Sequence, residues 1–120
     1  MNSVYPHSTP ELARNRGEFA PAQQAAFEAF GKAVFADGVL SGKIKQIIAV
    51  AVAHVTQCPY CIHGHTKAAL RAGATAQELT EAMWVAAEMR AGGAYAHSTV
   101  MLATLGEEEK KRRGRVSPST

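Results

Sequence analysis

Residues 41–73 read SGKIKQIIAVAVAHVTQCPYCIHGHTKAALRAG, and the first half of this stretch predicts a strongly apolar helix. Ser41 can cap this helix, because a serine hydroxyl accepts hydrogen bonds from the free N–H groups of a first turn. From residue 44 to residue 55, apolar side chains recur at helical spacing and form a wide face. We expect the helix to end near Thr56-Gln57 and to be buried on most sides.

The second half of the stretch predicts another helix, from Cys58 to Ala72. Pro59 fits only in the first turn of a helix, where its missing N–H breaks no hydrogen bond. Gly73 follows the last helical residue and is a typical C-terminal cap. Both cysteines, Cys58 and Cys61, are therefore expected at a helix start.

The residues before this stretch predict an arm and one further helix. Residues 1–18 mix proline and glycine with polar residues, so we expect an arm with at most a short helix from Pro10. From Pro21 onward, apolar residues recur at helical spacing until Asp37-Gly38 interrupts the pattern. One well-defined helix is therefore expected ahead of residue 41.

The residues after the stretch predict two more helices. Thr75 and Glu78 form a capping box, which opens a helix. Gly92-Gly93 is expected to end or kink it, and a last helix over residues 94–105 is expected to stop at Gly106. No strand pattern is present, so the sequence predicts an all-α fold, a compact domain of about five helices.

Length and composition favour one helical domain, residues 19–106, between the arm and a charged tail. The chain has 120 residues, and its 47% hydrophobic content is enough for one ordinary core. The net charge of +3 comes mostly from residues 107–120, a tail expected to be frayed or disordered, so nucleic-acid binding is not expected. No segment approaches the roughly 20 apolar residues that span a bilayer, and no leader pattern is recognisable, so we expect a cytoplasmic location.

Cys58 and Cys61 form a Cys-x-x-Cys pair whose spacing and position indicate thiol chemistry. A free cysteine has a pKa of about 8.5, and a helix N-terminus lowers it, which favours the reactive thiolate. Three residues apart at a helix start, the two sulfurs can form and break a disulfide with little backbone movement. His65 lies one turn after Cys61 and can accept a thiol proton, whereas His63 points about 200° away at roughly 100° per residue.

Two other interpretations of the cysteine pair are open on these observations. Free cysteines pack well in cores, so both could be small buried hydrophobes. Zinc could bind Cys58 and Cys61 with His65 or His54, and a neighbouring subunit could supply another ligand. The sequence contains no second Cys-x-x-Cys and no His-x3-His pair to complete a structural zinc site.

Four segments taken together resemble one known protein family. These segments are Lys43–Val52, Cys58–Ala69, Ala72–Thr75 and Gly92–Ala94. In this combination they are similar to the alkylhydroperoxidase D and carboxymuconolactone decarboxylase family, over roughly residues 25–105. The resemblance implies an all-helical fold that associates as trimers or hexamers, with a redox site near a subunit interface.

The resemblance also implies roles for the site residues. In the peroxidase branch of the family, the second cysteine, here Cys61, attacks the peroxide and becomes a sulfenic acid. The first cysteine, here Cys58, resolves the sulfenic acid to a disulfide. A histidine that matches His65 takes part in a proton relay, and a dithiol partner such as a lipoylated protein supplies the reducing equivalents.

Two positions depart from the pattern of that branch. The relay glutamate twelve residues before the first cysteine is replaced by Gln46, and an amide cannot exchange protons as a carboxylate does. The histidine that some members carry just before the second cysteine is replaced by Tyr60. Both changes indicate a divergent member with weaker or different activity.

The sequence therefore predicts a thiol-dependent peroxidase or disulfide reductase in antioxidant defence, with Cys61, Cys58, His65 and Gln46 as its site residues. The expected partners are a hydroperoxide, a dithiol or lipoylated protein reductant and further copies of the chain, with a hexamer favoured over a trimer. No cofactor, metal ion or membrane partner is expected. The alternatives are a carboxymuconolactone decarboxylase-like enzyme, against which the cysteine pair argues, and a zinc-binding or redox-sensing dithiol protein without turnover.

Overall fold

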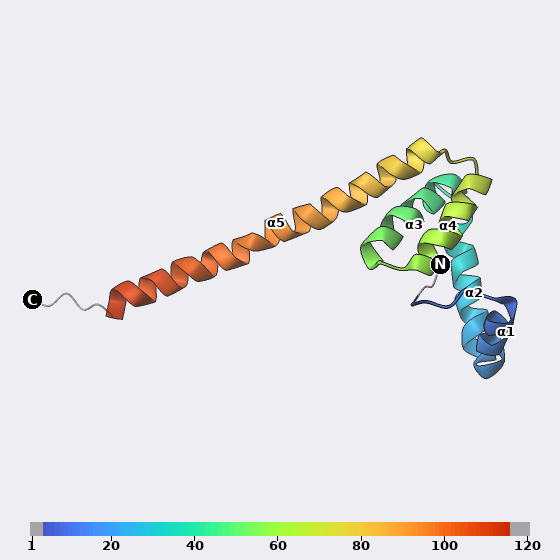
Figure 1. The fold of residues 1–120 in the computed structure, drawn as a ribbon, viewed down its shortest axis with the longest axis horizontal. Helices are drawn as coiled ribbons and strands as arrows, with labels where there is room; N and C mark the ends of the chain where they lie inside the picture. Colours follow the sequence, from blue (N-terminus) through green and yellow to red (C-terminus); the bar gives the residue numbers. More distant parts are fainter. Residues whose placement is uncertain (1–3, 116–120) are drawn as a thin grey trace, which may run out of the picture.

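The computed structural model describes residues 4–115, and this part of the chain folds into five α-helices without a strand. In chain order the helices are α1 (Pro10–Phe19), α2 (Pro21–Phe35), α3 (Gly42–Thr56), α4 (Pro59–Arg71) and α5 (Ala76–Arg115). Helix α3 packs against both α4 and α5, while α1 packs mainly against α2. Figure 1 shows this helical cluster at one end of the molecule, with α5 extending far beyond it. The predicted all-α fold class is confirmed.

The termini of α3 and α4 follow the capping signals in the sequence. The hydroxyl of Ser41 accepts a hydrogen bond from the backbone N–H of Ile44 at 3.2 Å and so caps α3. Gly73 has a φ of 98° and donates its N–H to the carbonyl of Leu70 at 3.0 Å, as a glycine C-cap requires. Both predicted caps are confirmed.

The buried core is small and lies where α3, α4 and the start of α5 meet. Its main cluster, with Ile47 packed against it, consists of Val50, Ala69, Ala74 and Leu79, and Ala53 and Ala86 are buried as well. Helix α3 is covered on this side alone, and Ile48 and Val52 on its outer face stay 46% and 51% exposed. The expectation that α3 is buried on most sides is therefore wrong for the single chain, because α4 and α5 cover only one of its faces.

Helix α5 is one continuous helix of 40 residues, whereas the sequence predicted a break at Gly92-Gly93 and a stop at Gly106. Both expectations are wrong. Among the glycines of residues 4–115, only Gly73 has a positive φ, so the α5 glycines do not adopt the left-handed conformation that ends a helix. Each glycine costs an α-helix about 1 kcal/mol relative to alanine, and strong helix formers on both sides carry the helix through.

Helix α5 also includes most of the charged tail. Residues 107–115, expected to be frayed or disordered, continue the helix, and residues 116–120 of the tail lie outside the described residues. Ion pairs three or four residues apart support this last segment, among them Lys111 with Glu108 at 3.3 Å. At the other end, α1 forms within the expected arm and reaches Phe19. The division into an arm at 1–18, a domain at 19–106 and a tail at 107–120 stays a prediction.

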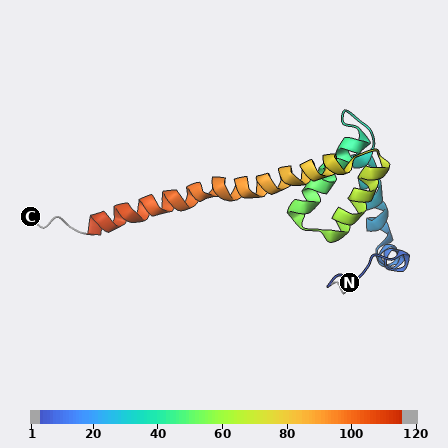
Figure 2. The same ribbon diagram turned by 45° about the horizontal axis from the view of Figure 1, so that its top comes forward.

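The chain is far more extended than a compact domain of its length. The Cα radius of gyration is 23.0 Å, and the molecule measures 78 × 37 × 37 Å along its principal axes. A compact chain of this size has a radius of gyration of about 14 Å. The difference comes from α5, whose C-terminal half projects away from the other helices in both views (Figures 1 and 2). Within residues 4–115, no helix has the length and apolar character needed to cross a membrane.

Candidate redox site

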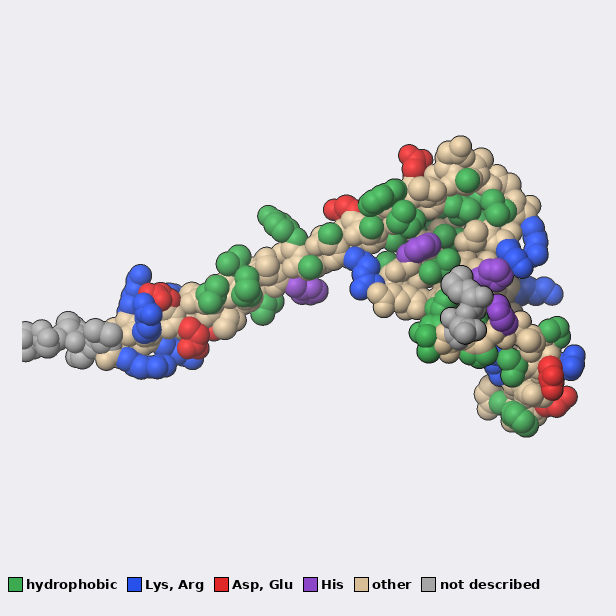
Figure 3. All heavy atoms as spheres, viewed as in Figure 1, with side chains coloured by type: hydrophobic (Ala, Val, Ile, Leu, Met, Phe, Trp, Pro, Cys, Tyr) green, Lys and Arg blue, Asp and Glu red, His purple; other side chains and the backbone are tan. Residues whose placement is uncertain are grey.

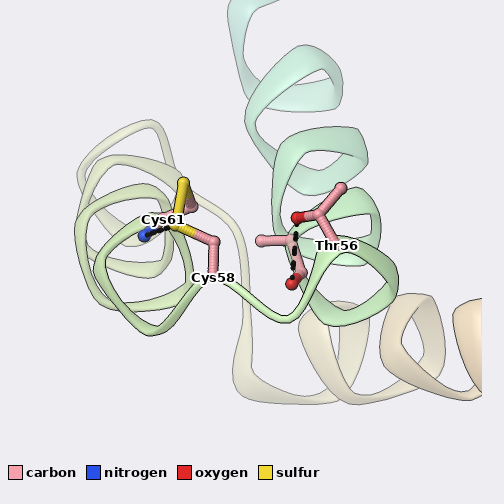
Figure 4. Close-up of a disulfide and its surroundings, with 4 residues drawn as sticks. Thr56, Cys58 and Cys61 are labelled. Carbon is pink, nitrogen blue, oxygen red and sulfur yellow. Dashed lines mark hydrogen bonds between the residues drawn. A yellow bond between two sulfur atoms is a disulfide. The ribbon is translucent and has the colours of Figure 1, made fainter. Parts of the chain in front are cut away.

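The two cysteines are joined in a disulfide at the start of α4, where the sequence predicted them. Cys58 is the N-cap residue of α4, and its sulfur accepts a hydrogen bond from the backbone N–H of Cys61 at 3.2 Å. The Cα atoms of the two cysteines are 5.2 Å apart. Figure 4 shows the bridge at the first turn of α4, across from Thr56 in the last turn of α3. The two thiols can therefore cycle through a disulfide within one helical turn.

His65 lies one turn after Cys61 and is held by two neighbours. Its Nδ1 is 2.8 Å from Oε1 of Gln46 on α3. Its ring stacks on Phe35 at the end of α2, with centroids 5.1 Å apart and an interplanar angle of 27°. An amide oxygen can only accept a hydrogen bond, so Nδ1 carries the hydrogen and Nε2 keeps its lone pair in the neutral ring. This tautomer leaves one imidazole nitrogen available to accept a proton.

Cys61 and His65 both line a pocket of about 380 Å³ between α2, α3 and α4. The pocket wall is mostly apolar; its lining residues are Val34, Phe35, Lys45, Ile48, Ala49, Val52, Ala53, Thr56, Cys61 and His65. Of the residues described, neither Cys58 nor Gln46 is among them. A molecule in this pocket therefore meets Cys61 and His65, whereas Gln46 acts on it only through His65.

The other sequence candidates lie away from this pocket. His63 is exposed and lines separate hollows on another face of α4, as its position on the helix predicted. His54 directs its Nδ1 to the carbonyl of Val50 at 2.7 Å, within α3. The Tyr60 hydroxyl donates a hydrogen bond to the carbonyl of Pro6 at 2.7 Å, and so ties the N-terminal arm to α4. The structure therefore groups Cys58, Cys61, His65 and Gln46 and leaves out the remaining histidines.

The zinc alternative concerns the reduced cysteine pair, whereas this structure holds the disulfide form. Both sulfurs are bonded to each other, and the sulfur ligand that zinc needs is a thiolate. Across residues 4–115, no cluster of three or more His, Cys, Asp or Glu side chains could hold a metal ion.

Two residues of the site were missed in the sequence. Phe35 was assigned only to the apolar pattern of its helix, and its stacking on His65 depends on how α2 packs against α4. Lys45 lines the pocket and donates from Nζ to the carbonyl of Ala36 at 2.6 Å. Its signal was present, because Lys45 precedes Ala49 and Val52 at helical spacing on the pocket side of α3.

The fold and the Cys-x-x-Cys site define a class of helical dithiol proteins, and residues 21–104 match the carboxymuconolactone decarboxylase family. The chain belongs to this family, which confirms the resemblance found in the sequence. A relative in Paracoccus denitrificans, uncharacterized protein 4 of the cox locus, is 56% identical over 103 residues, covering 83% of this chain and 93% of the relative.

Two solved structures share the fold. A carboxymuconolactone decarboxylase family protein from Legionella pneumophila superposes with a TM-score of 0.61 at 37% identity, covering 66% of this chain and 70% of that protein. A family member from Thermotoga maritima, for which a part in the antioxidative response has been suggested, superposes with a TM-score of 0.54 at 25% identity. It covers 75% of this chain and 96% of that protein.

Proposed function

We propose that the protein is a thiol-dependent peroxidase that reduces hydroperoxides with its Cys58–Cys61 pair. The observation that carries this proposal is the dithiol at the start of α4, with Cys61 and His65 lining one pocket. Members of this family include peroxidases and decarboxylases, and the redox-competent cysteine pair favours the first of these activities. The suggested antioxidative part of the Thermotoga maritima relative agrees with it.

In the first step, His65 Nε2 accepts the thiol proton of Cys61, and the thiolate attacks the outer oxygen of the hydroperoxide. The S–O bond forms as the O–O bond breaks. The departing alkoxide takes a proton, which the imidazolium of His65 can return, and leaves as an alcohol. Sulfur is oxidised to a sulfenic acid, and the peroxide is reduced by two electrons. Gln46 is a positioning residue in this step, because it holds the ring of His65.

In the second step, the thiolate of Cys58 attacks the sulfenic sulfur of Cys61, and hydroxide leaves as water after taking a proton. The N-cap position of Cys58 and the N–H of Cys61 stabilise negative charge on its sulfur, which prepares it for this role. A dithiol, such as a lipoylated protein, then reduces the disulfide by exchange and becomes a disulfide itself. If the reduced cysteine pair instead exchanged with an external disulfide and became oxidised, the protein would act as a disulfide reductase.

The apolar pocket wall indicates an organic hydroperoxide as the substrate. The organic group of such a molecule can pack against Val34, Ile48 and Val52 while its peroxide group contacts Cys61. Hydrogen peroxide has no apolar part and gains nothing from this wall. We therefore propose a preference for alkyl or aryl hydroperoxides, in a cytoplasm that supplies dithiol reductants.

The test begins with the reduced protein and one equivalent of cumene hydroperoxide. We expect titratable thiols to fall from two to none in the wild type as the disulfide forms. In Cys58→Ser, Cys61 should stop at a sulfenic acid that a cyclic 1,3-diketone traps. Cys61→Ser lacks the thiol that lines the pocket, so this variant should not react with the hydroperoxide there. Unchanged thiols in the wild type would sink the peroxidase proposal.

Turnover needs a reductant, so peroxide consumption should be screened with dihydrolipoamide and thioredoxin. Continuous consumption with dihydrolipoamide, lost in either cysteine variant, would support the complete cycle. If the protein reduces an external disulfide with these donors but leaves peroxide untouched, the disulfide reductase takes the place of the peroxidase.

A further inference from the structure

A second hollow lies on another face of α4, between that helix and the N-terminal arm. It has a volume of about 520 Å³, within the range of small-molecule sites. Its lining residues are Tyr5, Pro6, His7, Ser8, Pro59, Tyr60, His63, Gly64, Lys67 and Arg71. None of these residues lines the Cys61–His65 pocket, so the two hollows are separate.

Basic side chains form one wall of this arm pocket. His63, Lys67 and Arg71 follow each other at intervals of four residues, so they lie in a row along one face of α4. His7 adds a fourth basic group from the arm. Figure 3 shows lysine, arginine and histidine side chains gathered on the side of the helical cluster where the arm lies.

The lysine and arginine of this row have no acidic counterpart in the pocket. None of its lining residues within the described chain is Asp or Glu, and no ion pair is formed there by Lys67 or Arg71. The helix dipole explains a basic residue such as Arg71 in the last turn of α4, but it offers nothing to His63 in the first half. The row therefore places the two positive charges of Lys67 and Arg71 along an open, solvent-exposed hollow.

The hollow is aromatic at the start of α4, where Tyr60 lies on the same helix as the basic row and contacts the arm. The Tyr60 hydroxyl donates to the carbonyl of Pro6 at 2.7 Å, which joins residues 54 positions apart. The rings of Tyr5 and Tyr60 meet edge to face with centroids 6.0 Å apart. These contacts hold the arm over α4 and give the pocket a ring surface beside its charges.

We propose that this pocket binds a small aromatic anion, a compound with a carboxylate or phosphate group attached to a ring. Arg71 can hold two oxygens of such a group through its guanidinium fork, and Lys67 adds a compact charge beside it. The tyrosine rings pack against the apolar part of the ligand. The proposal stands on the arm pocket alone and does not depend on the peroxidase activity.

Phenyl phosphate is the probe for the test, added to the disulfide form of the full chain. Calorimetry and amide chemical shifts should show binding at the pocket, tighter than for inorganic phosphate, which lacks the ring, or phenol, which lacks the charge. The Lys67→Met/Arg71→Met variant should bind phenyl phosphate at least about tenfold more weakly, the loss expected from one hydrogen bond to a charged group.

The matched control is Lys110→Met/Arg115→Met, which removes the same two kinds of charge from the exposed end of α5. It should leave the affinity for phenyl phosphate unchanged. Equal weakening in both double variants would reveal nonspecific attraction and overturn the proposal. An absence of phenyl phosphate binding at millimolar concentration would also overturn the proposal. So would binding of polyglutamate, but not of phenyl phosphate, that depends on Lys67 and Arg71, because it would assign the surface to an acidic protein.

Discussion

At the level of single residues, the hydrogen bond between Gln46 Oε1 and His65 Nδ1 holds the imidazole in place. The amide orients the ring and fixes its tautomer, but it cannot share the proton that the ring receives from Cys61. A carboxylate at the same position would stabilise the imidazolium and pass a proton on. We therefore expect Gln46→Glu to accelerate Cys61 oxidation by up to about 10²- to 10⁴-fold, the range for well-placed general base catalysis.

Second-order rates of Cys61 oxidation in the wild type, Gln46→Glu and Gln46→Glu/His65→Ala measure this effect. The gain should vanish in the double variant, because the glutamate acts through His65. A negative charge near the thiol can also disfavour the thiolate and offset part of the gain. If Gln46→Glu brings no acceleration, or if its gain survives the loss of His65, the relay does not pass through this pair of residues.

The candidate site could be predicted where one helix decides the geometry. The choice of His65 over His63 needs only the rotation of about 100° per residue along α4, and the structure places the two on different faces. The stacking of Phe35 and the bond between Tyr60 and Pro6 could not be foreseen in this way. Both contacts join segments far apart in the chain, and their formation depends on how whole helices pack.

At the level of elements, local capping chemistry made most helix boundaries predictable. Ser41, Gly73 and the Thr75–Glu78 box each satisfy backbone groups within a few residues, and all three form as expected. The glycines of α5 were misjudged because a glycine ends a helix only when the following chain supports a left-handed turn. Their sequence neighbours favour helix on both sides, and no proline follows before residue 118.

The continuity of α5 leads to a test at Gly93. A Cβ built there meets nothing within 4 Å. If the helix runs through this position, Gly93→Ala should raise the free energy of unfolding by about 1 kcal/mol. Urea titrations measure this difference. Gly73→Ala is the control and should lower stability, because Gly73 has a φ of 98°. No gain at Gly93 would restore the predicted break.

The start of α5 has a pH-dependent contact with α3. The backbone N–H of Thr75 donates a hydrogen bond to the carboxylate of Glu78 at 2.9 Å, and Lys43 forms an ion pair with the same carboxylate at 3.2 Å. These contacts hold the pKa of Glu78 below its ordinary value of 4.5. A lowered folded-state pKa means that this stabilisation is present above pH 4.5 and is lost as the pH falls through the folded value.

We therefore expect the wild type to lose more stability than Glu78→Gln when the pH is lowered from neutral to below 4.5. Thermal unfolding of the two proteins across this interval measures the difference. The carboxylate is exposed, so the effect should be small and should shrink in high salt. Parallel pH profiles would show that the capping box gains nothing from the charge of Glu78.

At the scale of the whole molecule, one chain leaves much of its apolar surface uncovered. Phe27 and Phe30 on α2 are 70% and 64% exposed, and the outer face of α3 is about half exposed. The far half of α5, which projects away from the helical cluster (Figure 1), carries exposed apolar residues; they include Tyr95, Val100, Met101, Leu102 and Leu105. Large exposed apolar surface of this kind usually marks an interface. We propose that copies of the chain cover it in a closed homo-oligomer, most simply a hexamer.

Light scattering at micromolar concentration tests the assembly, which for six chains of 12.8 kDa should have a mass of about 77 kDa. Met101→Glu/Leu105→Glu places two charges on the apolar surface of α5 and should shift the mass towards smaller species, because a buried unpaired charge is strongly unfavourable.

Thr99→Glu/Ala103→Glu is the control. It adds the same charges with the same spacing about 200° around the helix, since successive residues are roughly 100° apart. It should leave the assembly intact if one face of α5 forms the contact. A wild type with the mass of one chain would refute the oligomer, and dissociation by both variants would mean that partners surround α5 on all sides.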